Sequence, residues 1–135
     1  MGTAPGAKPL RECLVKLEGI LGEVEDGGQL RPIQIHDIIC HLAEAVLSGG
    51  IRRSATISFF SKDDLEMRSA KMGSWWELNP QRAMANNSVV LERSNTTFDE
   101  FNEIWEYSKN SGSGEPGFIW TDNPDMCGNP LIVAA

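Results

Sequence analysis

A polar segment near the middle of the chain carries the residue types that recognise nucleotides. Asn79, Gln81 and Arg82 lie within four positions of one another, and Asn86 and Asn87 follow shortly after. Side-chain amides both donate and accept hydrogen bonds, so they can pair with base edges and ribose hydroxyls. The segment therefore suggests a nucleotide-reading loop, although surface loops are polar in any protein. From these residues alone both interpretations stay open.

Two other residue pairs could bind a ligand. His36 and Cys40 lie four positions apart on one face of a predicted helix, a spacing that could begin a zinc site. No further Cys/His pair supplies the remaining ligands, and Cys40 continues an apolar stripe, so core packing is the favoured interpretation. Arg52 and Arg53 precede a predicted strand, where they could form surface ion pairs or clamp a phosphate or carboxylate.

Helices are predicted from the spacing of apolar residues and from end signals. Apolar side chains recur every three or four positions over residues 7–25 and 32–48, and a pair of glycines follows each segment. A short helix is predicted for residues 62–71, led by the acidic pair Asp63 and Asp64. Another begins after Thr97, which suits the N-cap position, and has two acidic residues in its first turn.

Strands are predicted at residues 54–60, 88–92 and 117–121, which are short and rich in β-branched and aromatic residues. Residues 72–87 lack periodicity and are predicted to form an ordered loop, because Trp75 and Trp76 rarely lie in a floppy one. Helices that alternate with strands predict an α/β fold. Three such strands rarely close a sheet alone, so we expect a piece of a larger protein.

Charge and cysteine content narrow the setting. The 135 residues carry a net charge of −7, which argues against broad binding to nucleic acid or to an anionic membrane. No apolar run approaches the roughly 18 residues that a membrane-spanning helix needs. The three cysteines, Cys13, Cys40 and Cys127, include no CxxC pair. They therefore favour a reducing, cytoplasmic setting over a disulfide framework.

A series of short blocks runs in a fixed order along nearly the whole chain, from Gly2 to about Pro130. The blocks are GTAPG (2–6), LRPI (30–33), HDIICH (36–41), AVLSGGIRRSA (45–55), FS (60–61), DD (63–64), PQRA (80–83), NNSVV (86–90) and GEPGF (114–118). Together they resemble the large, catalytic chain of ribonucleotide reductases, and most closely the adenosylcobalamin-dependent class (class II). Each block is short, but their shared order makes the resemblance specific.

The resemblance implies a fold and an activity. The family folds as a ten-stranded α/β barrel several times longer than this chain, so these residues would be a partial segment of it. Such enzymes convert ribonucleotides to deoxyribonucleotides for DNA synthesis by thiyl-radical chemistry, and adenosylcobalamin supplies the radical. The implied partners are a ribonucleotide substrate, a nucleotide effector and the missing remainder of the reductase.

The resemblance also assigns specificity loops. Residues 2–10 correspond to the first loop, which senses the effector, and residues 72–87 to the second, which reports the effector to the substrate base. This strengthens the interpretation of the polar segment. The residues implied for these loops are Gly2, Thr3, Gly6, Gln81, Arg82, Asn86 and Asn87.

The C-terminal residues depart from the family pattern Asn-x-Cys-x-Glu. Asn129 matches the asparagine that hydrogen-bonds the ribose hydroxyls, and Pro130 follows it in the substrate-binding segment. Leu131 stands where the family has its radical-bearing Cys, and Val133 stands where it has the general-base Glu. Leucine cannot carry a thiyl radical and valine cannot accept a proton.

We therefore expect residues 1–130 to be a fragment of the reductase barrel and residues 131–135 to be a non-matching tail, read through past a gene break. Such a chain would be inactive alone. The alternative is a non-catalytic remnant that binds nucleotide or packs against a partner chain.

Overall fold

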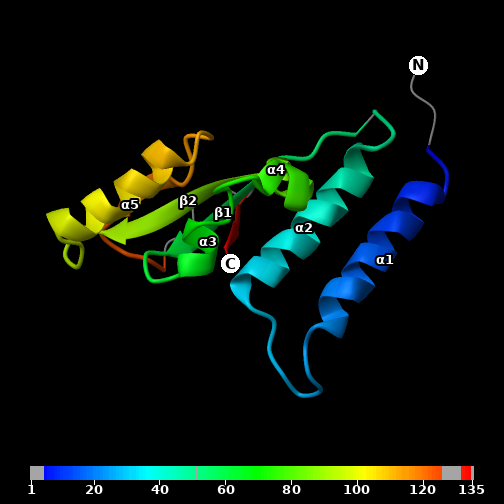
Figure 1. Cartoon of the computed structure of the whole chain (residues 1–135), viewed down its shortest axis with the longest axis horizontal. Coiled ribbons are helices and arrows are strands. Elements are labelled where there is room, and N and C mark those ends of the chain that lie inside the picture. The colour runs from blue at the N-terminus through cyan, green and yellow to red at the C-terminus, as the bar shows by residue number, and fades with distance from the viewer. Residues whose placement is uncertain (1–4, 51, 126–131, 135) are drawn as a thin grey trace.

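A parallel β-sheet with helices on one face forms the centre of the fold. The computed structural model describes residues 5–50, 52–125 and 132–134. The predicted α/β class is confirmed, and the arrangement is consistent with a segment of an α/β barrel (Figure 1). The elements in chain order are α1 (Lys8–Gly22), α2 (Pro32–Leu47), β1 (Thr56–Ser61), α3 (Leu65–Arg68), α4 (Trp75–Leu78), the 3-10 helix η1 (Pro80–Met84), β2 (Ala85–Glu92), α5 (Phe98–Asn110), β3 (Gly117–Thr121) and β4 (Ile132–Ala134).

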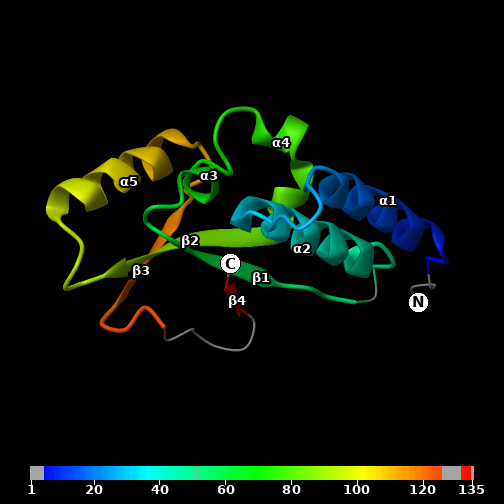
Figure 2. The same ribbon diagram turned by 90° about the horizontal axis from the view of Figure 1, so that it is seen from below.

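The strands lie in the order β3-β2-β1-β4, and every neighbouring pair is parallel. Parallel neighbours need a crossover connection, and α5 provides it between β2 and β3. Figure 2 shows the helices on one side of the sheet. The three predicted strands are confirmed. The short strand β4 was not predicted.

The side chains that face the helices form the core. Phe60 of β1 pairs in register with Val89 of β2, and both side chains are buried beneath the helices. Because side chains alternate along a strand, Leu91 lies on the same face as Val89. Ile104 of α5 and Met67 of α3 complete this cluster from above. The sheet and its crossover helices thus share one apolar layer.

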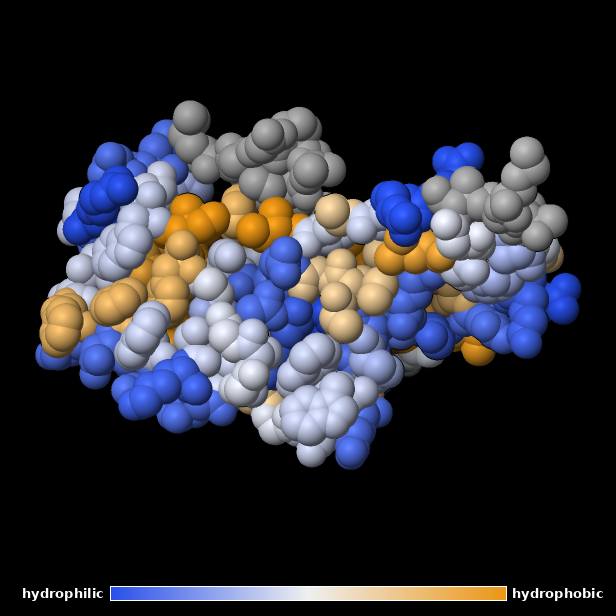
Figure 3. Space-filling view, turned by 90° about the horizontal axis from the view of Figure 1, so that it is seen from above, coloured by the Kyte–Doolittle hydropathy of each residue, from blue (hydrophilic) through white to orange (hydrophobic). Residues whose placement is uncertain are grey.

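Helix α1 covers much less of its apolar stripe. Its single buried residue is Cys13, whereas Leu10, Leu14 and Leu21 are each more than half exposed. Pro9 lies in the first turn of the helix, as predicted, but the helix ends at Gly22 rather than near residue 25. At the other end of the molecule, Figure 3 shows further apolar side chains (orange) at the surface near α5. The surface therefore carries apolar side chains both at α1 and near α5 that the described residues do not cover.

The start of α5 is fixed by a capping box, and its N-cap is Thr97, as predicted. The Thr97 hydroxyl accepts a hydrogen bond from the Glu100 amide at 3.2 Å, and the Glu100 carboxylate accepts one from the Thr97 amide at 2.8 Å. Hydrogen bonds from Lys62 and Thr97 lower the pKa of Glu100 to about 2. The helix that joins β2 to β3 is therefore held at its first turn by side chains.

Replacement of the capping threonine tests this interpretation. We expect Thr97→Ala to lower the free energy of unfolding by about 1 kcal/mol, because the amides of the first helical turn lose an acceptor. Urea denaturation followed by circular dichroism measures the change. Thr96→Ala is the matched control, because the Thr96 hydroxyl has no hydrogen-bond partner among the described residues. Equal losses in the two variants would contradict the role of the cap.

Candidate functional site

The segment that was predicted to read nucleotides lies against the side of α2. The contact with this helix is made by η1, and α4 packs in turn on η1. Pro80 in the first turn of η1 directs the chain back towards the sheet, and η1 packs on α2 before β2 begins at Ala85. The prediction of one ordered loop over residues 72–87 is therefore wrong. This range contains two short helices, α4 and η1, and the first residues of β2. Each helix is too short to show a period in the sequence.

Arg82 is bound in place by two elements. Its Nε and one terminal nitrogen donate to the two carboxylate oxygens of Asp37, each at 2.8 Å, in a bidentate ion pair. Its other terminal nitrogen donates to the Ala70 carbonyl at 2.9 Å. The side chains of both charged residues are largely buried. All three guanidinium nitrogens thus have partners within the protein, and Arg82 joins α2, η1 and the turn after α3.

Gln81 joins the same cluster. Its side chain is buried, and Nε2 donates to Asp37 Oδ1 at 3.1 Å and lies 3.4 Å from Asn79 Oδ1. Asp37 therefore accepts hydrogen bonds from Gln81 and Arg82, two of the five residues that were predicted to read nucleotides. The structure brings Gln81 and Arg82 together at the Asp37 carboxylate of α2.

Asn86 and Asn87 do not lie on the loop where they were predicted. Both belong to β2, where consecutive side chains point to opposite faces of the sheet. Asn86 is exposed, on the face away from the helices, whereas Asn87 is buried on the helix side, opposite Ser58 of β1. The Asn87 backbone amide donates to Glu115 at 2.9 Å, but both side-chain polar atoms lack a partner among the described residues. These two asparagines cannot act on one ligand from one face.

A groove beside the Asp37 cluster is lined by residues of α1, α2 and the segment 78–82. Its volume is about 660 Å³. Two ion pairs lie on its walls, Arg82 with Asp37 and Arg31 with Glu66. Other lining residues are Lys16, Ile20, Glu23, Gln34, His41 and Asn79. The groove is polar, and four of its charged side chains form these two pairs.

His36 and Cys40 belong to the buried layer between α2 and the sheet. His36 Nδ1 lies 2.7 Å from the Ser58 hydroxyl, and its Nε2 lies 3.7 Å from the Cys40 sulfur. Burial lowers the pKa of His36 from 6.5 to about 4 and raises the pKa of Cys40 to about 12. Both groups are therefore neutral near pH 7, and within the described ranges no three His, Cys, Asp or Glu side chains gather as metal ligands.

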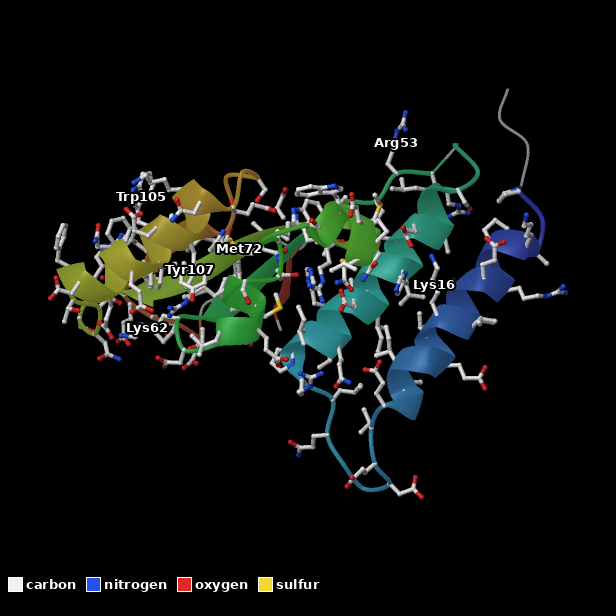
Figure 4. All side chains as sticks on the ribbon, viewed as in Figure 1. Lys16, Arg53, Lys62, Met72, Trp105 and Tyr107 are labelled. Carbon is white, nitrogen blue, oxygen red and sulfur yellow. The ribbon has the colours of Figure 1, made fainter. Side chains whose placement is uncertain are left out.

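The remaining predicted residues fall into two groups. Arg52 and Arg53 are exposed, and Figure 4 shows Arg53 pointing away from the body of the protein. Gly6 precedes α1 with φ +73°, a conformation that favours glycine. Gly2, Thr3, Asn129, Pro130 and Leu131 lie outside the described residues. Val133 lies in β4, opposite Ser58 in the register.

Sequence reasoning missed Asp37 and the pair Lys71–Glu115. Lys71 and Glu115 form an ion pair, and the side chains of both residues are largely buried. Neither carries a local signal, because they are brought together only by the fold. Asp37 does have one: Gln34, Asp37 and His41 recur at spacings of three and four, which places a polar line beside the apolar stripe of α2.

Comparisons with known proteins show which class of proteins this chain is similar to. No family model matches the chain, and no solved structure matches it. Curated proteins do match, and they confirm the resemblance to the catalytic chain of ribonucleotide reductases that depend on adenosylcobalamin.

The relatives are named as adenosylcobalamin-dependent ribonucleoside-triphosphate reductases. That of Lactobacillus delbrueckii subsp. bulgaricus is 31% identical over 121 residues, which is 90% of this chain. That of Lacticaseibacillus paracasei is 34% identical over 119 residues, or 87% of the chain. A probable reductase of the same name in Dictyostelium discoideum is 30% identical over 130 aligned residues. In each case the chain spans about 15% of the relative's length.

Proposed function

We propose that this chain supplies the substrate-specificity segment and part of the parallel sheet of an adenosylcobalamin-dependent ribonucleoside-triphosphate reductase. It would act only together with the remainder of such an enzyme. The observation that carries the proposal is the similarity over nine-tenths of the chain to relatives of that name. Their name points to ribonucleoside triphosphates as the substrate class and to deoxyribonucleotides as the products. A cytoplasmic setting is supported by the free thiols of Cys13 and Cys40.

The proposed roles follow the matching positions. Asn129 would bind the ribose hydroxyls, with Pro130 beside it, while residues 2–10, including Gly2, Thr3 and Gly6, would sense a nucleotide effector. Gln81 and Arg82 would form the segment that adapts to the substrate base. Asn86 is exposed at the start of β2 and would lie on the side of the sheet away from the helices.

The described residues do not fit the cofactor. A corrin ring with its nucleotide tail is larger than the groove of about 660 Å³, and four of the charged side chains on its walls form ion pairs with one another. We therefore assign no step to adenosylcobalamin within this part of the chain. It would be held by the remainder of the enzyme.

One observation favours a second function, a non-catalytic module that binds nucleotide or packs on a partner chain. Leu131 and Val133 occupy the positions of the radical-bearing Cys and the general-base Glu in the resembling family. Neither side chain can transfer a hydrogen atom or a proton. In this case the contacts with a partner would remain while turnover would be absent.

Reassembly with a relative separates the two functions. The chain is co-expressed with the Lactobacillus leichmannii reductase from which the matching segment has been removed, and ribonucleoside-triphosphate reduction is assayed with adenosylcobalamin and a dithiol. We expect the chain to copurify with this remainder. We expect Leu131→Cys with Val133→Glu to raise turnover at least about a hundredfold, because a thiol and a proton acceptor are restored.

The matched control is Leu131→Ser with Val133→Gln, which restores polarity without a thiol or a carboxylate and should leave turnover at the background of the remainder alone. Copurification without turnover in the Cys/Glu variant would favour the non-catalytic module. Absence of copurification would overturn the proposed function.

A further inference from the structure

The carboxylate of Asp37 is the point at which the polar side chains of the reading segment converge. It accepts two hydrogen bonds from Arg82 and one from Gln81, at 2.8, 2.8 and 3.1 Å. Two consecutive residues of η1 are thus fixed by one side chain that lies about 45 positions earlier in the chain. Bidentate geometry restrains the guanidinium in orientation as well as in position.

Asp37 is itself held by a rigid helix. On one side of it, His36 is 1% exposed and lies 2.7 Å from Ser58 of β1, which ties α2 to the sheet. On the other side α1 packs along α2, and Lys16 of α1 reaches across to Glu44 at 3.2 Å (Figure 4). A displacement of α2 relative to the sheet would therefore move the carboxylate that holds Gln81 and Arg82.

Arg82 adds a second connection. Its third nitrogen donates to the Ala70 carbonyl, at the end of the turn that follows α3. Three of the five guanidinium N–H groups are thus bound to Asp37 or to this turn. Its contacts within the chain therefore set the path of residues 79–84, and the immediately following residue, Ala85, begins β2.

We infer that Asp37 is a positioning residue, which fixes the conformation of the segment 79–84 through Arg82 and Gln81 and thereby sets its preference among substrate bases. The part of the inference that concerns substrate bases rests on the proposed function. The positioning of residues 79–84 by Asp37 is a property of this chain alone. Asp37 would touch neither substrate nor cofactor. It acts through the two side chains that it holds.

Hydrogen exchange on the full chain tests the positioning. In Asp37→Asn the side chain keeps its size but loses the charge and one acceptor, so we expect the amides of residues 79–84 to exchange at least about tenfold faster. Amides of β2 beyond Asn87 and of α5 should keep their protection. Asp37→Glu, which keeps the carboxylate, should recover part of the lost protection.

The matched control is Glu44→Gln. Glu44 lies on the same helix and pairs with Lys16 of α1, so this variant removes an ion pair of α2 without touching η1. Its exchange in residues 79–84 should equal that of the unmodified chain. Unchanged protection in Asp37→Asn, or faster exchange everywhere in the chain, would overturn the inference.

A second readout addresses specificity. In the reassembled reductase that carries Leu131→Cys and Val133→Glu, Asp37→Asn should change the ratio of kcat/KM between purine and pyrimidine ribonucleoside triphosphates by about fivefold or more. A uniform loss for all four substrates would show a merely structural role and would overturn the specificity part. Failure of reassembly would instead count against the proposed function, and the exchange result on this chain would stand independently of it.

Discussion

Protonation of one buried histidine is expected to remove about 3 kcal/mol of folding free energy between pH 6.5 and pH 4. Burial lowers the pKa of His36 to about 4, against 6.5 for an exposed histidine. Below pH 6.5 the His36 side chain is therefore protonated in the unfolded chain, whereas in the folded chain it stays neutral until the pH falls to about 4. Stability is lost as the pH falls through this window, and no further loss from His36 follows below it.

The surroundings of His36 explain why its neutral form is kept. Desolvation is the largest cause of the shift; Asp37 raises the pKa, while Arg82 and Lys71 lower it. The ring lies against Ser58 on the sheet and Cys40 on its own helix, and both are neutral there. No carboxylate accepts a hydrogen bond from the ring among the described residues, so an imidazolium would be buried without a direct partner.

Urea denaturation at a series of pH values measures this effect. His36→Gln should be less stable at pH 7 but should lose the part of the pH dependence between 6.5 and 4 that His36 causes. His41→Gln, on the same helix, keeps His36 and should keep the fall. Direct titration of the His36 ring signals by NMR is independent of the variants, and a midpoint near 6.5 would refute the prediction.

The helices and strands could be predicted because their sequences carry a local period. Residues 32–47 repeat apolar side chains every three or four positions, and the observed α2 matches the predicted helix within one residue at its C-terminal end. The segment 72–84 could not be divided in the same way. Helices of four or five residues make little more than one turn, so no apolar period can appear in them.

Strand β2 shows a second limit. It begins at Ala85, three residues before the predicted start, with two asparagines that disfavour strands. Their conformation is set by pairing with Ile57 and Ser58 of β1, as the register shows. A single sequence cannot reveal such pairing partners. Because β2 is longer than predicted, it includes Asn86 and Asn87. Consecutive side chains of a strand point to opposite faces of the sheet, so the two asparagines are separated.

The candidate site was predicted in part. Amide and guanidinium chemistry pointed to Gln81 and Arg82, and the structure places them together. Asp37, which holds both, is 44 positions from the nearer of them, and a charged residue on a predicted helix is most simply interpreted as solvated. Ion pairs of this range depend on packing. The local signal for such a residue is a line of polar side chains beside the apolar stripe of its helix, such as Gln34, Asp37 and His41 on α2.

The largest loss of stability is expected from truncating the centre of the core. Phe60 is 2% exposed between the helices and the sheet, whereas Phe98 at the start of α5 is 77% exposed. Phe60→Ala should lower the free energy of unfolding by about 3–5 kcal/mol, because the cavity left among Met67, Val89 and Ile104 cannot fill completely. Phe98→Ala removes the same atoms and should change it by less than about 0.5 kcal/mol.

The comparison also tests how the apolar pattern of α5 is to be interpreted. Phe98 and Ile104 are both apolar residues of α5, but of the two only Ile104 is buried by the described elements. Chemical denaturation of the two alanine variants, made under identical conditions, gives both values. A large loss in Phe98→Ala would mean that its ring is covered in solution. In the reassembled reductase, by contrast, a loss of affinity for the remainder in Phe98→Ala alone would identify this exposed ring as part of the contact, because the variant leaves the core of the chain intact.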